Sequence, residues 1–168
     1  MRAPAISMIL IAEALFLATA IAQQDNGNSA TASCDFDDGQ EITLKYNGST
    51  LSSKDEPRNG KVWLPGGSAM TLFTQVPLTL NGKQIPVGAY SVYAIPGKKE
   101  WILIVNKNVT DPAKYDEQQD IARATMDLGE VNSPPRQLQA SFAHSGAKVC
   151  GIRLYYEKTG AFAEFNEK

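Results

Sequence analysis

Residues 76–107 constrain the fold most, because their strand and turn signals agree with one another. Asn81-Gly82 separates two short extended runs, and this dipeptide supplies the positive φ values of a two-residue hairpin turn. Residues 90–95 then alternate with a period of two, and residues 101–105 form an unbroken apolar run. Five residues bounded by turns are too few for a buried helix, so this run predicts a central strand covered on both sides.

The rest of the chain repeats the pattern of short extended segments between turns. Further strands are expected at residues 32–36, 41–46, 70–75, 121–128, 138–142, 149–157 and 161–165, with residues 158–160 as the last turn. Only residues 111–115, with Asp followed by Pro, have a helix start signal. About nine or ten short strands without helical crossovers predict an all-β fold, an antiparallel β-sandwich with at most one short helix.

The N-terminus has the pattern of an export signal. Arg2 precedes an apolar region at residues 6–19, and Ala20-Ile21-Ala22 has the small-x-small form of a cleavage site. Residues 1–22 are therefore interpreted as a signal peptide, although the carboxylate of Glu13 in the apolar region disfavours membrane insertion. An uncleaved membrane anchor is the alternative. Residues 23–32 are polar and predict a disordered leader, which leaves residues 33–168 as a single domain in a secreted or periplasmic protein.

Charge and cysteine content narrow the class of protein. The net charge of −2 gives no reason to expect nucleic acid as a partner. The two cysteines, Cys34 and Cys150, are expected to form a disulfide that places the first strand beside the strand starting at Val149. Two separate buried thiols are the alternative, and a catalytic thiol is disfavoured because the single histidine, His144, has no evident orienting partner.

Several motifs together indicate a family. They are Gly60-Lys61-Val62-Trp63, the run from Ile85 to Tyr90 with Ile95-Pro96-Gly97, residues 101–107, and Tyr115-Asp116-Glu117 with Asp120-Ile121-Ala122-Arg123. In these the chain resembles the DUF2911 family of exported bacterial proteins, which implies a secreted or periplasmic β-domain with no established activity. Members usually carry arginine, asparagine and glutamate where this chain has Leu64, Ser68 and Ala69, so a polar site there is expected to be lost.

Two groups of residues are candidates for binding. Asp116, Glu117 and Asp120 could offer oxygen ligands to Ca²⁺, but their spacing does not match an EF-hand, and a solvated acidic turn is preferred. Arg123 could instead pair with Asp116 or Asp120 and pin the loop.

The second group is aromatic and comprises Trp63 and Tyr156, together with Tyr46 and Tyr155. These side chains could form a platform for a sugar ring, although core packing is the more frequent use of such residues. Tyr90, two residues after Gly88, has the arrangement of a tyrosine corner, in which the hydroxyl binds nearby backbone.

The sequence contains no serine-histidine-acid pattern, phosphate-binding glycine loop or zinc spacing. We therefore expect no catalytic residue, cofactor or metal. The expected function is an exported, non-catalytic domain that binds a glycan or another envelope component, or is structural in the cell envelope. A carboxylate-dependent glycan hydrolase is the alternative, because carboxylates distant in sequence can meet in the fold. The oligomeric state and the role of the polar loop at residues 47–60 stay open.

Overall fold

The computed structural model describes residues 28–48, 56–64, 67–135 and 137–168. The predicted signal peptide at residues 1–22, the first part of the predicted leader and half of the polar loop at residues 47–60 lie outside these ranges. Within them, no helix is long and apolar enough to cross a membrane.

Eleven strands and one turn of 3-10 helix make up the described part of the chain. They are β1 (Ser29–Asp35), β2 (Glu41–Asn47), β3 (Met70–Thr74), β4 (Leu78–Leu80), β5 (Lys83–Ile85), β6 (Gly88–Ile95), β7 (Trp101–Asn106), η2 (Glu117–Gln119), β8 (Asp120–Glu130), β9 (Gln139–Gly146), β10 (Val149–Tyr156) and β11 (Thr159–Glu167).

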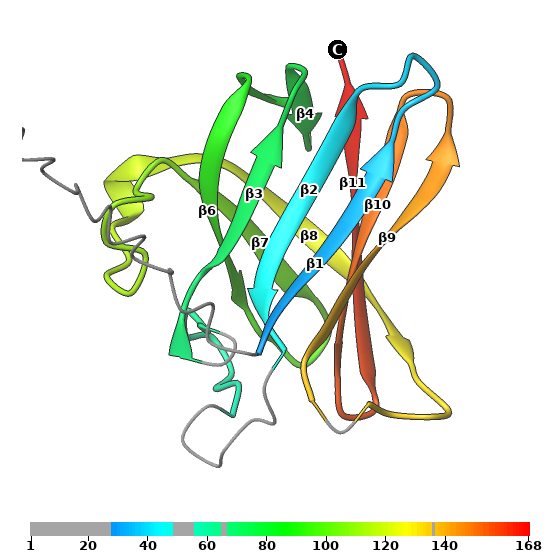
Figure 1. The fold of residues 1–168 in the computed structure, drawn as a ribbon. Coiled ribbons are helices and arrows are strands. Elements are labelled where there is room, and N and C mark those ends of the chain that lie inside the picture. The colour runs from blue at the N-terminus through cyan, green and yellow to red at the C-terminus, as the bar shows by residue number, and fades with distance from the viewer. Residues whose placement is uncertain (1–27, 49–55, 65–66, 136) are drawn as a thin grey trace, which may run out of the picture.

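Nine of these strands follow one another in a single sheet, in the order β1-β2-β3-β6-β7-β8-β11-β10-β9. Every neighbouring pair is antiparallel, and the β4–β5 hairpin pairs with the end of β11. The sheet curls on itself into a nearly closed barrel, which brings β1 against β9 (Figure 1). The predicted all-β, antiparallel class is confirmed, and the strands belong to one continuous sheet.

The closing contact between β1 and β9 differs from every other neighbour relation. Strand direction alternates along an antiparallel order, so with nine strands the first and last run in the same direction. No ladder of backbone hydrogen bonds pairs β1 with β9 in the described residues. We call this contact the seam. It is closed near the ends of the two strands by the Cys34–Cys150 disulfide and by the Asp37 amide, which donates to the Ala147 carbonyl at 3.0 Å.

The disulfide prediction is therefore confirmed, whereas the strand adjacency inferred from it needs correction. Cys150 lies in β10, which pairs with β9 and β11, so β1 faces β9 across the seam and not β10. The disulfide joins β1 to β10 although β9 is the strand beside β1. This is possible because both cysteine side chains are buried in the core and their Cα atoms are 6.2 Å apart.

Alternation along the strands places the core inside the barrel. Ile42, Leu72, Val92, Leu103 and Phe165 are among the buried residues of this cluster. β7 is also covered on its outer face, where Ile104 of β7 and Tyr93 of β6 are buried. The segment after β7 provides this cover, because the Tyr93 hydroxyl donates to the Pro112 carbonyl at 3.0 Å. The predicted two-sided burial of the central strand is thus confirmed.

Local predictions were correct where turn chemistry is strong. Asn81 and Gly82 have φ values of 49° and 73°, as the hairpin prediction requires. The Tyr90 hydroxyl donates to the Pro86 carbonyl at 2.9 Å, which confirms the tyrosine corner.

Three boundaries were wrong. Strand β1 begins at Ser29, inside the predicted leader. Backbone pairing with β2 stabilises this part of the strand, although Ala30 and Ala32 have small side chains that bury little apolar surface. The helical turn lies at Glu117–Gln119, after the predicted helix start at residues 111–115. The last hairpin turns at residues 157–158, because Thr159 and Gly160 already pair in β11.

Candidate functional site

Four of the six predicted binding residues lie in or beside the segment at residues 107–119, which we call the carboxylate loop. The side chain of Asn106, at the end of β7, fixes where the loop leaves the sheet and where it returns. Its amide donates to the Asp116 carbonyl at 2.8 Å and to Asp120 Oδ1 at 2.6 Å, and its Oδ1 accepts from the Asn108 amide at 2.8 Å.

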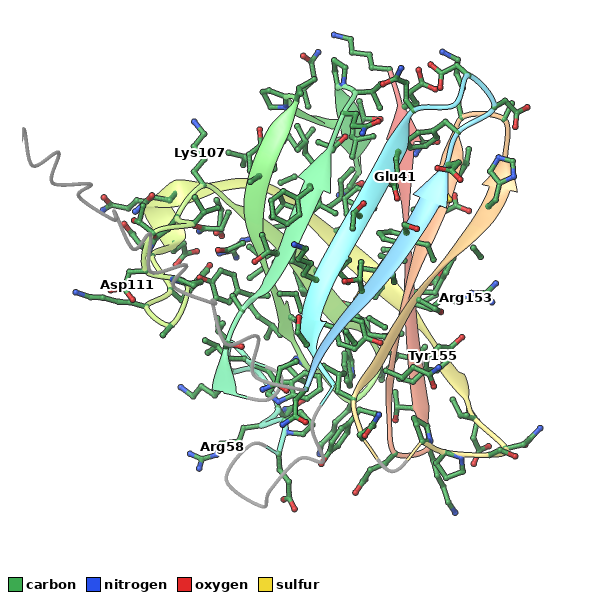
Figure 2. All side chains as sticks on the ribbon, in the orientation of Figure 1. Glu41, Arg58, Lys107, Asp111, Arg153 and Tyr155 are labelled. Atoms are coloured by element: carbon green, nitrogen blue, oxygen red, sulfur yellow. A yellow bond between two sulfur atoms is a disulfide. The ribbon has the colours of Figure 1, made fainter. Side chains whose placement is uncertain are left out.

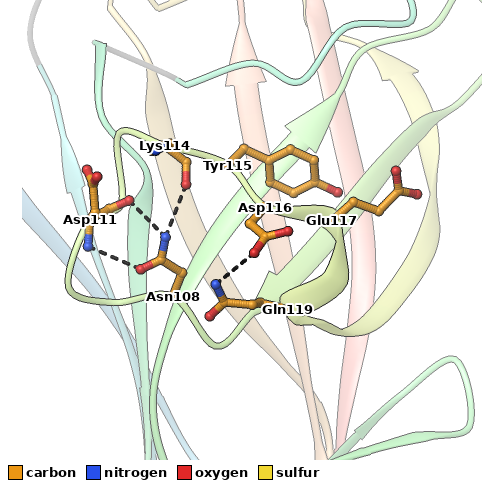
Figure 3. Close-up of a pocket in the computed structure, with 7 residues that line it drawn as sticks. All are labelled: Asn108, Asp111, Lys114, Tyr115, Asp116, Glu117 and Gln119. Atoms are coloured by element: carbon orange, nitrogen blue, oxygen red, sulfur yellow. Dashed lines mark hydrogen bonds between the residues drawn. The ribbon is translucent and has the colours of Figure 1, made fainter.

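Asn108 shapes the first half of the carboxylate loop (Figure 3). Its Nδ2 donates to the carbonyls of Asp111 and Lys114, both at 3.1 Å, and its Oδ1 accepts from the Asp111 amide at 3.1 Å. These bonds hold residues 111–114 in a turn in place of the predicted helix. Asp116 then caps η2, because its Oδ1 accepts from the Gln118 amide at 3.0 Å.

Asp120 is the centre of the charged network at the end of the loop. Its Oδ2 accepts from the Tyr115 hydroxyl at 2.7 Å and from Arg123 Nε at 2.8 Å. Arg123 Nη2 also donates to the Tyr115 hydroxyl at 2.7 Å and to Glu117 Oε1 at 2.9 Å. The interpretation that Arg123 pins the loop is confirmed for its pair with Asp120, and the second ion pair is with Glu117 instead of Asp116.

The pKa shifts in the loop follow from these bonds. Burial raises the pKa of Tyr115 to about 12, and the hydrogen bond to Asp120 contributes in the same direction. The hydrogen bond to Asp120 raises the pKa of Arg123. Donation by the Gln119 side chain, and then by the Gln118 amide, lowers the pKa of Asp116.

The carboxylate loop encloses an open depression of about 680 Å³. However, the carboxylates of Asp116, Glu117 and Asp120 already accept hydrogen bonds from protein donors. Among the described residues, no three side chains of ligand type gather as a metal ion requires. The contacts of this loop therefore serve to hold it against β6 and β7.

The other two predicted binding residues, Trp63 and Tyr156, lie at the end of the barrel where the β10–β11 hairpin turns. Trp63 is only 4% exposed, and its amide donates to the Ala94 carbonyl at 2.7 Å. Its ring packs edge-on against Trp101, with centroids 5.5 Å apart, and against Tyr156, with centroids 5.3 Å apart. Trp63 therefore supports the neighbouring aromatic rings from behind.

Trp101 and Tyr156 line a groove of about 360 Å³ in front of Trp63, which we call the aromatic groove. The other lining residues come from the segment before Trp63, the β6–β7 turn and the β10–β11 hairpin: Glu56, Pro57, Asn59, Pro96, Gly97, Lys98, Glu157 and Thr159. Arg58, between two of them, marks this end of the barrel (Figure 2).

Backbone contacts hold two walls of the groove together. The Gly60 amide donates to the Pro96 carbonyl at 2.8 Å, which fixes the segment before Trp63 against the β6–β7 turn. Gly97 is required in that turn, because a Cβ atom there would collide with the Glu100 carbonyl.

The polar side chains of the groove contrast with those of the carboxylate loop. Glu56, Asn59, Lys98, Tyr156 and Glu157 make no side-chain hydrogen bond or ion pair with another described residue. Burial raises the pKa of the Tyr156 hydroxyl, and the negative charges of Glu157 and Glu56 raise it further. The groove thus keeps donors and acceptors available beside an aromatic ring.

The sequence reasoning identified Tyr156 but missed most of the groove. The sequence pattern around Trp101 indicates only a buried strand. Glu157 lies beside the predicted last turn, and nothing in the local sequence marks it as part of a groove. No local signal connects these residues with Glu56 and Pro96, because only the fold brings them together. Of the other aromatic candidates, Tyr46 packs against the core. Tyr155 lies on the opposite face of β10 from Tyr156, with its ring over Gly160.

Fold and groove define an antiparallel β-domain, nearly closed as a barrel, with a small aromatic groove at one end. The family of proteins of unknown function designated DUF2911 matches residues 29–165, and the chain belongs to this family. Comparison with curated proteins and with solved structures gave no match.

Proposed function

We propose that this protein is an exported, non-catalytic domain that binds a glycan in the aromatic groove. The observation that carries the proposal is the ring of Tyr156 in a groove whose charged and amide side chains make no hydrogen bond or ion pair within the described part of the chain. Sugars present apolar C–H faces that pack on aromatic rings, and hydroxyls that require nearby donors and acceptors. The groove offers both, from Tyr156 on one hand and from Glu56, Asn59 and Thr159 on the other.

The dimensions of the groove support a small ligand. Its volume of about 360 Å³ lies at the lower end of the range of about 300–1,000 Å³ that is usual for small-molecule sites. A groove of this size accommodates one or two sugar rings, such as those at the end of a longer glycan. Export is supported by the signal-peptide pattern of residues 1–22 and by the disulfide, since disulfides persist in oxidising compartments.

The test is a binding titration of the mature protein against a panel of neutral, amino and acidic mono- and oligosaccharides. Trp101 lines the groove and Trp63 packs against it, so the tryptophan fluorescence of the protein reports on occupancy. We expect Tyr156→Ala to weaken binding at least about tenfold, which corresponds to about 1.4 kcal/mol. Tyr155→Ala is the matched control, because Tyr155 is the adjacent residue on the other face of β10. Equal effects of the two variants, or no binding by any sugar, would contradict the proposal.

A carboxylate-dependent glycan hydrolase is the second candidate, because Glu56 and Glu157 line the same groove from different segments. Glycosidases use two carboxyl groups, one of which protonates the leaving oxygen while the other acts as nucleophile or base. Turnover of an oligosaccharide that disappears in Glu157→Gln, with binding retained, would favour the hydrolase over the binding domain.

A further inference from the structure

The aromatic groove has an uneven charge lining. Two acidic side chains, Glu56 and Glu157, line it, against one basic side chain, Lys98. No ion pair within 4.0 Å joins Lys98 to either carboxylate. The two carboxylates come from different segments, so their common position is a product of the tertiary fold. Both side chains are exposed.

The two carboxylates act on the same ring. Burial is the main cause of the raised pKa of the Tyr156 hydroxyl, and the charges of Glu157 and Glu56 add to it, so their negative potential reaches the side chain that the ligand would contact. The face of an aromatic ring itself attracts cations. An ammonium group near Tyr156 would therefore be favoured by the ring and by both carboxylates, whereas a ligand carboxylate there would be repelled.

The backbone at Glu157 adds a further observation. Glu157 has a φ of 48°, a left-handed conformation that Asn or Gly adopts more readily, as Asn81 and Gly82 do in the β4–β5 hairpin. The β10–β11 hairpin thus holds a glutamate at a position where its backbone is disfavoured.

We propose that the aromatic groove selects a glycan with a free amino group, a hexosamine whose ammonium lies between Tyr156 and the carboxylates of Glu56 and Glu157. This inference rests on the proposed function and names the class of sugar that the groove takes. N-acetylation of the same sugar removes the positive charge and leaves the ring almost unchanged. A comparison of the binding of the amino sugar with that of its N-acetylated form therefore isolates the effect of the positive charge.

The experiment compares oligomers of glucosamine and of N-acetylglucosamine, with glucose and glucuronate oligomers alongside, by calorimetric titration at low salt. We expect the glucosamine oligomer to bind at least about tenfold more tightly than its acetylated counterpart, and this preference to decrease as salt screens the charges. The double variant Glu56→Gln/Glu157→Gln should remove the preference. Glu164→Gln, an exposed carboxylate on β11 outside the groove, should retain it.

The outcomes separate the inference from the function on which it rests. If acetylated and free sugars bind equally well and Tyr156→Ala weakens both, the groove binds glycans but the selection of an amino group is wrong. If the preference persists in the double glutamine variant, the charge is recognised elsewhere and the inference is also wrong. If no oligomer binds in a way that depends on Tyr156, both the inference and the proposed function fail.

Discussion

Cys34 and Cys150 are 116 residues apart in sequence, and their disulfide joins β1 to β10 across the seam of the barrel. Antiparallel pairing of nine strands leaves β1 and β9 parallel at this seam, where no ladder connects them in the described residues. The bond therefore closes the barrel at the position where backbone pairing does not. The Asp37 amide, which donates to the Ala147 carbonyl, and Asp37 Oδ1, which lies 3.2 Å from His144 Nε2, accompany it there.

Removal of the disulfide should destabilise the protein and open the seam first. In the chain-entropy model, a loop of this length contributes about 4 to 5 kcal/mol to the free energy of unfolding. We expect Cys34→Ala/Cys150→Ala to lower the urea midpoint by a corresponding amount, with faster hydrogen exchange in β1 and β9 than in the central strand β7. Unchanged stability, or exchange that increases equally in all strands, would show that the seam does not depend on the bond.

The hydrogen bonds around Asp120 should stabilise the carboxylate loop much more than the exposed Arg123–Glu117 ion pair does. Asp120→Asn keeps the shape of the side chain but removes a charge that Tyr115 and Arg123 both contact. We expect a loss of about 2 kcal/mol in the free energy of unfolding, because hydrogen bonds to charged groups contribute about 1.5–3 kcal/mol.

Glu117→Gln is the matched control for Asp120→Asn, because the Glu117 side chain is 75% exposed although it pairs with the same arginine. Exposed ion pairs contribute at most about 1 kcal/mol, so this variant should remain close to wild type in urea unfolding. Equal losses in the two variants would mean that burial does not decide the strength of these contacts.

Alkaline pH should weaken the protein through Tyr115. Its pKa is about 12 in the folded protein, against an ordinary value of 10.0, so the folded state retains the proton in a range where the unfolded state releases it. The contribution of Tyr115 is complete below pH 10 and is lost as the pH rises towards 12. Urea unfolding at several pH values from about 9 to 11 should therefore show a shallower decline in Tyr115→Phe than in wild type. Parallel declines would contradict the assigned shift.

The sequence was most informative where local chemistry decides the structure. The Asn81-Gly82 turn, the tyrosine corner of Tyr90 and the apolar run of β7 were predicted because each depends on a few adjacent residues. The extent of β1 was missed, since its small alanines are stabilised by pairing with β2, which no local pattern reveals. The disulfide was predicted from compartment and cysteine count, but the neighbour of β1 was not, because it depends on how the whole strand order closes.

The candidate site was predicted only in part, for the same reason. Asp116, Glu117, Asp120 and Arg123 are close in sequence, so their grouping was visible, yet their charges turn out to be used within the loop. Tyr156 and Glu56 are 100 residues apart in sequence, and only the barrel brings them into one groove. Whether a polar side chain has an intramolecular partner also depends on the tertiary fold.

The central claim is that the aromatic groove is the binding site. Its most direct test is a backbone amide NMR titration of the ¹⁵N-labelled mature domain with a glucosamine oligomer. The predicted result is a set of saturable shifts confined to the groove, at residues 56–59, 97–98 and 156–159, with residues 108–119 of the carboxylate loop unaffected. Shifts centred on the carboxylate loop, or none at concentrations that saturate the tryptophan fluorescence signal, would contradict the claim.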